Sequence, residues 1–146
     1  MIRLTDRLWI GDSADEEHGD LTIDHIGAVL NVAQDLQGTV GWANGVEYAQ
    51  VGLIDGPGNT LEGYYAAVLA LASLVRRHKV LVFDHTGGRV LAVSLMYLNL
   101  TARWGWDGWM KILSERVEGE LPKSNQVHKD AFNKLNWRVL ATAIEG

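Results

Sequence analysis

Cysteine is absent from the 146-residue sequence, and this absence excludes several kinds of chemistry at once. Without thiols the chain can form no disulfide, no thiolate zinc site and no cysteine nucleophile. Proline is also rare, with only Pro57 and Pro122 in the whole chain. No proline-rich or serine-rich linker divides the sequence, and at roughly 100–200 residues per domain its length predicts one domain over residues 1–146.

Basic charge and long apolar runs are scarce as well. The sequence has 13 Lys and Arg against 18 Asp and Glu, for a formal net charge of −5. This balance argues against a nucleic-acid partner, which needs a basic face. No apolar run reaches the roughly 18 residues of a membrane span, and the first residues lack a signal-peptide pattern. We therefore expect a cytoplasmic protein with no membrane partner, whose oligomeric state the sequence leaves open.

Short apolar runs alternate with amphipathic segments along the chain. The runs 26–33 and 80–83 are apolar on both faces, as in strands buried within a parallel sheet. Further strands are expected at 4–10 and 46–53. Helices are expected after an N-cap at Asn59, from Arg89 to about Leu100, from Asp107 to about Val117 and from Ser124 to about Ile144. This alternation indicates an α/β fold with helices on both faces of the sheet.

The segment 80–89 is the most informative part of the chain. An apolar strand leads into a glycine turn, and a helix begins at Arg89. Backbone N–H groups of such a turn can converge on one point, and the helix N-terminus adds about half a positive charge. A guanidinium can add a bidentate contact. The pattern predicts an anion-binding loop, unless the glycines serve only to allow a sharp turn; its residues are His85, Thr86, Gly87, Gly88 and Arg89.

Nearly the whole chain resembles the dual-specificity phosphatases, a branch of the cysteine-based protein tyrosine phosphatase superfamily. The fragments that carry the resemblance follow one another in the family's order: Leu8–Gly11, Val29–Val32, Tyr48–Asp55, Val80–Val82, Arg89, Tyr97–Leu98, Pro122, Asn125, Phe132 and Leu135. The resemblance implies a small, mostly parallel sheet of four to five strands flanked by helices.

The family's signature, His-Cys-x-x-Gly-x-x-Arg, is altered in this sequence. Phe83 stands at the histidine position and Asp84 at the position of the nucleophilic cysteine. Arg89 follows Asp84 by five residues where the family has six. The resemblance places the general acid at Asp55. The carboxylate of Asp84 reaches further than a thiolate, so we expect it to accept loop N–H bonds and to pair with Arg89.

These departures favour a pseudophosphatase that needs no cofactor or metal and acts by binding, with a phosphorylated protein or a small anion as the expected partner. One alternative is a divergent phosphohydrolase that uses Asp84 or a metal-bound water, with Asp55 as general acid. In that case His85 could complete an Asp/Asp/His metal set. A second alternative is an interaction protein that uses another face, such as the tryptophan-rich stretch 104–109. For these tryptophans, packing at the edge of the core is the favoured interpretation.

Overall fold

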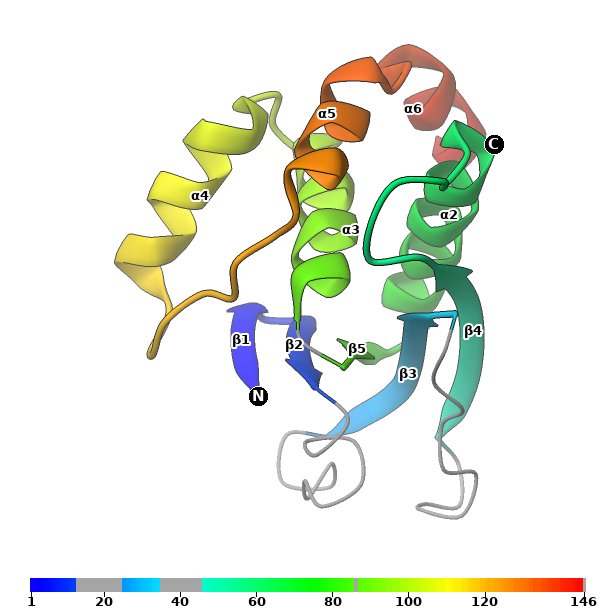
Figure 1. The fold of residues 1–146 in the computed structure, drawn as a ribbon. Coiled ribbons are helices and arrows are strands. Elements are labelled where there is room, and N and C mark those ends of the chain that lie inside the picture. Colours follow the sequence, from blue (N-terminus) through cyan, green and yellow to red (C-terminus); the bar gives the residue numbers. More distant parts are fainter. Residues whose placement is uncertain (13–24, 35–45, 86, 146) are drawn as a thin grey trace.

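A single five-stranded sheet organises the protein (Figure 1). The structure is a computed structural model that describes residues 1–12, 25–34, 46–85 and 87–145. The strand order is β1–β2–β5–β3–β4. Its strands are β1 (Ile2–Thr5), β2 (Leu8–Asp12), β3 (Ile26–Ala33), β4 (Glu47–Leu53) and β5 (Lys79–Asp84). The β1–β2 pair is antiparallel, and the β2–β5, β5–β3 and β3–β4 pairs are parallel. The mostly parallel sheet is confirmed, with β5 at its centre.

Five helices are described, and Figure 1 shows all of them on one side of the sheet. They are α2 (Leu61–Arg77), α3 (Gly88–Asn99), α4 (Gly105–Arg116), α5 (Gln126–Lys134) and α6 (Trp137–Glu145). Helices α2 and α3 contact the strands, while α4 and α5 pack on α3, and α6 packs on α2. The described residues thus supply helices to one face of the sheet, where two covered faces were expected. The opposite face carries a smaller apolar cluster that includes Trp9, Leu81 and Phe83.

The core holds both β5 and α3, the two elements that the loop after β5 connects. Val80, Leu81 and Val82 are fully buried, as expected for a central strand covered on both faces. Helix α3 is buried along nearly its whole length, because it lies between the sheet and the helices packed on it. The connection from β5 to α3 is therefore anchored at both ends in the core.

Two strands replace the single strand expected at 4–10. The chain forms a β1–β2 hairpin in which Ile2 pairs with Ile10. Its turn is closed by local bonds, from the Arg3 guanidinium to Asp6 and from the Arg7 N–H to the Thr5 hydroxyl. No glycine or proline marks this turn, so the composition gave no sign of it.

Three expected helix starts are also wrong. Thr60 caps α2 by accepting from the Gly63 N–H, whereas Asn59 bonds back to Ile54. Helix α4 begins after Trp104, three residues earlier than a cap at Asp107 would give. The expected last helix is two helices, and Asn125 caps the first of them.

The break between α5 and α6 follows from backbone conformation. Leu135 is extended, with φ −63° and ψ 142°, and Asn136 then accepts from the Val139 N–H at the start of α6. The expected strands and helices elsewhere agree with the structure to within one or two residues. No helix in the described ranges has the length and apolar character that a membrane crossing requires.

Candidate functional site

Asp84 lies at the carboxyl end of the central strand, where a parallel sheet usually presents its ligand site. The loop between Asp84 and Arg89 joins β5 to α3, and below it is called the loop 84–89. Asp84 is fully buried and Arg89 is 3% exposed. A buried carboxylate is tolerated only when donors and a counter-charge surround it, and both are present here.

The carboxylate of Asp84 is turned into the loop 84–89. Its Oδ1 accepts the Gly87 backbone N–H. Its Oδ2 accepts both the Arg89 backbone N–H at 3.0 Å and the Arg89 Nε–H at 3.1 Å. These donors are of the kind that such a loop offers to a bound anion. The expected inward turn of Asp84 is confirmed, since its own carboxylate accepts from them.

Arg89 also connects the loop 84–89 to the end of β4 by a hydrogen bond. Its Nη1–H donates to the Leu53 carbonyl at the end of β4, over 2.9 Å. Ser124 adds a second tie, since its hydroxyl donates to the Gly88 carbonyl at 2.9 Å. The guanidinium therefore holds both the Asp84 carboxylate and the strand that leads to Asp55.

Gly87 adopts the left-handed conformation, with φ 89°. A Cβ at this position would stand 2.8 Å from the Pro122 Cβ. Both the backbone angle and the close approach of Pro122 thus require glycine here. Gly88 is also buried, and a Cβ on it would lie 3.8 Å from the Asp55 Oδ1. Asp55 consequently lies beside the first turn of α3.

The Asp55 side chain belongs to a chain of hydrogen bonds that sequence reasoning did not find. Its Oδ1 lies 2.9 Å from the His128 Nε2, and the His128 Nδ1 lies 2.7 Å from the Tyr64 hydroxyl. His128 is fully buried, and Asp55 is 34% exposed. His128 is 73 residues from Asp55 in the sequence, so no local spacing could have indicated the contact.

The proton positions along this series of hydrogen bonds follow from its last member, Asn59. The Ile54 N–H donates to the Asn59 Oδ1 at 2.8 Å, which leaves the Asn59 amide nitrogen as the donor to the Tyr64 hydroxyl oxygen at 3.2 Å. The Tyr64 proton is then directed to the His128 Nδ1. This assignment pairs every donor with an acceptor and leaves the His128 Nε2–H to donate to Asp55. Asp55 is thus a hydrogen-bond acceptor in this structure.

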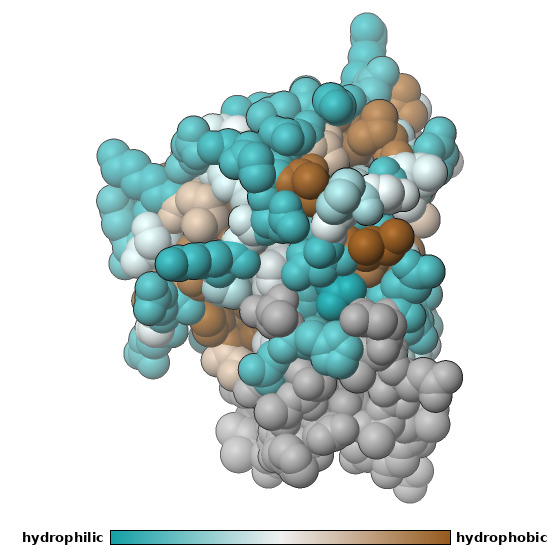
Figure 2. Space-filling model, in the orientation of Figure 1, coloured by the Kyte–Doolittle hydropathy of each residue, from teal (hydrophilic) through white to brown (hydrophobic). Residues whose placement is uncertain are grey.

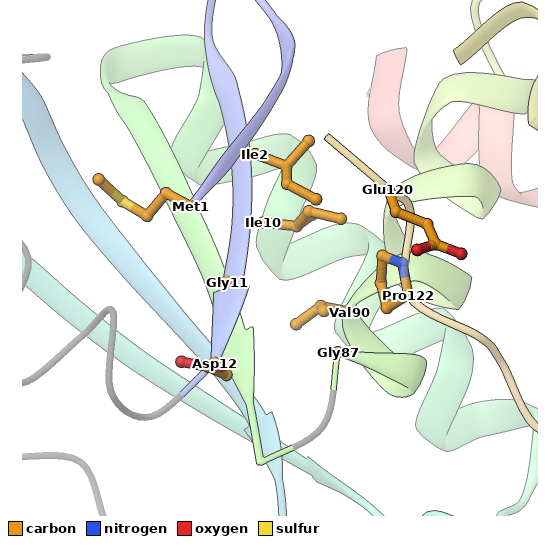
Figure 3. A pocket seen from close by; sticks show the side chains of 9 residues that line it. All are labelled: Met1, Ile2, Ile10, Gly11, Asp12, Gly87, Val90, Glu120 and Pro122. Atoms are coloured by element: carbon orange, nitrogen blue, oxygen red, sulfur yellow. The ribbon is translucent and has the colours of Figure 1, made fainter. Parts of the chain in front are cut away.

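A front cavity of about 270 Å³ opens beside these groups and is lined by Gln34, Ile54, Asp55 and Arg89. A rear cavity of about 240 Å³ lies on the Gly87 side of the loop. Figure 3 shows Ile2, Ile10 and Val90 around the rear cavity, with Pro122 facing them from the segment before α5. Both cavities carry charged side chains: Asp55 and Arg89 line the front cavity, and Asp12 and Glu120 line the rear cavity.

The chain was compared with protein-family models, with curated protein sequences and with solved structures, and only the solved structures match it. No family model and no curated protein sequence matches this chain. Among solved structures it is similar to DUSP15, with a TM-score of 0.80 and 13% identity over 98% of this chain and 93% of that one. Human DUSP28 has a TM-score of 0.71 and 20% identity, covering 99% of this chain and 98% of that one.

A mouse putative dual specificity phosphatase, solved as a complex with zinc tungstate, has a TM-score of 0.76 and 21% identity. It covers 98% of this chain and 90% of its own. The chain has the dual-specificity phosphatase fold. Its five-stranded sheet with flanking helices is the α/β architecture expected from the sequence.

Within this fold, the predicted site residues do not all come together. Asp84, Gly87 and Arg89 form one hydrogen-bonded unit, and Asp55 lies next to it. His85 is exposed, and Thr86 falls outside the described residues. In the described part of the chain, no three His, Asp or Glu side chains are grouped closely enough to hold a metal ion. The Asp84, Asp55 and His85 set considered from the sequence does not form such a group.

The tryptophans lie mainly at the edge of the core. Trp106 and Trp109 are 9% and 6% exposed, and Trp104, at 48%, lies against Trp109 with ring centroids 4.5 Å apart. Figure 2 shows one face of the molecule as mostly hydrophilic, with separate apolar patches. The burial of Trp106 and Trp109 agrees with the packing role favoured from the sequence.

Proposed function

We propose that this protein is a catalytically inactive domain of the dual-specificity phosphatase fold that acts by binding a partner at the carboxyl edge of its sheet. The observation that carries the proposal is the arrangement of Asp84. Both of its carboxylate oxygens accept hydrogen bonds from within the loop 84–89. A nucleophile for phosphoryl transfer needs those donors around the substrate, because they stabilise the charge that develops on the phosphoryl oxygens.

The Asp55 arrangement supports the same proposal. A general acid must hold a proton that it can give to the leaving group. Asp55 instead accepts the His128 Nε2–H in this structure. The sequence alternative of a divergent phosphohydrolase needs Asp55 as an acid, and the hydrogen-bond chain supplies no proton to it.

A phosphorylated or otherwise anionic partner is the sequence-based expectation for this site. The filled loop supports only weak phosphate binding in it. An incoming anion would meet the Asp84 carboxylate, and two like charges 4 Å apart repel by about 4 kcal/mol at an effective dielectric of 20. Removal of the Asp84 charge should therefore strengthen phosphate binding.

Hydrolysis of an aryl phosphate tests the proposal directly. We expect no turnover above the uncatalysed rate, with or without added Mg²⁺, Mn²⁺ or Zn²⁺. The D84C variant should also stay inactive, because a loop one residue shorter than the family's cannot wrap the phosphate with the same donors. Turnover by the wild-type protein that is abolished in D84A would overturn the proposal, because a contaminating phosphatase would be unaffected by that substitution.

A further inference from the structure

A groove lies between α4 and the segment that leads to α5, outside the loop 84–89. Its volume is about 390 Å³, and it is called the α4 groove below. The residues given for its lining all fall in the described range 87–145. Figure 1 shows α4 beside this segment, which runs from the end of α4 to the first turn of α5. A hollow of this size lies within the range of ligand-binding pockets.

The floor of the α4 groove is apolar. Trp106 and Met110 stand four residues apart on one face of α4, and Leu121 and Pro122 line the groove from the neighbouring segment. Trp106 is held against the Phe132 ring of α5, with ring centroids 5.5 Å apart. Met110 is half-buried, and the flexible thioether of methionine adapts readily to an incoming apolar group. The floor thus combines a fixed aromatic ring with an adaptable side chain.

Lys123 gives the rim of the α4 groove a positive charge. It is exposed, and it makes no ion pair with any residue of the described ranges. Lys129 lines the groove too, but it is paired with Asp107 at 3.0 Å. Ser124 and Gln126 are the uncharged polar residues of the lining. A lysine beside an apolar groove favours a carboxylate on the group that enters it.

The backbone of the segment 120–123 offers hydrogen-bonding groups next to this groove. Within the described part of the chain, none of its N–H or C=O groups is hydrogen-bonded to another protein group. The segment belongs to no helix or strand, and Glu120 and Lys123 at its ends are exposed. A peptide in extended conformation can pair with such a backbone through its own main chain, as in strand addition at a sheet edge.

We propose that the α4 groove binds an extended segment of a protein partner in which a large apolar side chain lies next to a carboxylate. The apolar side chain enters the groove against Trp106 and Met110, and the carboxylate meets Lys123. The partner's main chain pairs with the segment 120–123. The inference goes beyond the proposed function, because the groove lies among the helices and its lining includes no residue of the loop 84–89.

The probe is the peptide acetyl-Ala-Glu-Phe-Glu-Ala-amide, and its binding to the full chain is followed by ¹H–¹⁵N chemical shifts at low salt. Replacement of its phenylalanine by alanine should weaken binding by at least about tenfold, because the ring loses its burial in the groove. Replacement of both glutamates by glutamine should weaken binding by about two- to fivefold, the range of an exposed ion pair. The shifts should be centred on the Met110 and Leu121 backbone N–H groups and the Trp106 indole N–H.

Two further probes test the main-chain pairing. One is methylated at the phenylalanine nitrogen and the other at the nitrogen of the following glutamate. Successive residues of an extended chain direct their N–H groups to opposite sides, so only one of these groups can donate to the segment 120–123. We therefore expect one methylated probe to bind several-fold more weakly than the other.

Three variants locate the contacts. K123Q should bind the acidic probe no more tightly than the glutamine probe, and its affinity for the glutamine probe should equal that of the wild-type protein. K134Q removes an exposed lysine at the last residue of α5 and should leave the difference between these probes unchanged. M110Q places an amide in the groove floor and should weaken every phenylalanine-containing probe. Unchanged shifts elsewhere in the spectrum establish that each variant is folded.

The inference is wrong if the acidic probe shows no saturable binding up to about 10 mM, or if its shifts are centred on the loop 84–89. It is also wrong if K123Q retains the difference between the acidic and glutamine probes, or if the two methylated probes bind equally. None of these measurements involves phosphate or hydrolysis, so the proposed function stands or fails on its own experiments.

Discussion

The two sides of the candidate site are built over very different distances along the chain. One side, below called the loop side, consists of Asp84 and its donors, which lie within five residues of one another. The other, below called the acid side, consists of Asp55 and the side chains that hold it. Asp55 is hydrogen-bonded to His128, which is 73 residues away, and His128 is hydrogen-bonded to Tyr64, which is 64 residues away. A change on the loop side can therefore be recognised in a short motif, whereas the acid side exists only in the folded protein.

The loop side should be the more sensitive to loss of a charge. In R89M the Asp84 carboxylate keeps its burial and loses its counter-charge, and breaking a buried pair in this way costs about 3–5 kcal/mol. We expect a loss of that size in the free energy of unfolding, measured by urea denaturation. The double variant D84L/R89M removes both charges and should be more stable than R89M alone; a lower stability would contradict the pairing.

Gly87 tests whether the loop needs its backbone conformation or only its side chains. In G87A the left-handed φ costs about 1–2 kcal/mol, and the approach of the Pro122 ring adds about 1–3 kcal/mol. Gly119 is the matched control, because its φ is 97° and no atom lies near its Cβ position. We expect urea denaturation to show a larger loss for G87A than for G119A, and equal losses would remove the role of Pro122.

His128 is the corresponding test on the acid side. H128F keeps a buried ring but removes the hydrogen bonds from His128 to the Tyr64 hydroxyl and to Asp55, and loss of the acceptor for the buried Tyr64 O–H costs about 1–3 kcal/mol. Because Tyr64 and His128 act through one hydrogen bond, the losses in H128F and Y64F should not add in the double variant. Thermal unfolding of the three proteins provides the comparison, and strict additivity would show that the two residues act independently.

The smallest effect concerns alkaline pH on the acid side. Burial raises the pKa of Tyr64 above its ordinary 10.0, and the Asp55 charge raises this pKa further against the opposing hydrogen bond from Asn59. The unfolded chain then loses the phenolic proton first, so this contribution to stability is complete below about pH 10 and declines as the pH rises toward the folded-state pKa. Unfolding from about pH 9 to about pH 11 should show a shallower decline for Y64F than for the wild-type protein. Parallel curves would contradict the role of Tyr64.

The sequence predicted those parts of the fold that local patterns determine. The runs at β3 and β5 are apolar on both faces, which fits strands inside a parallel sheet, and the structure has them there. The β1–β2 turn and the break at Leu135 carry no glycine or proline, and their only local signals are the single polar residues Asp6 and Asn136, which the sequence interpretation did not use. The same contrast holds at the site. The inward turn of Asp84 follows from its own motif, while the role of His128 depends on α5 packing beside the loop that carries Asp55.

The central claim is that Asp84 occupies the anion position of the loop 84–89. Calorimetric titration with inorganic phosphate, comparing the wild-type protein with D84A and D84N, tests it most directly. D84N retains the side-chain shape and so serves where loss of the whole side chain disturbs folding, which circular dichroism checks. The account predicts weak binding to the wild-type protein and at least about tenfold tighter binding once the charge is removed. Phosphate affinity that is unchanged or lower in a folded Asp84 variant would contradict it.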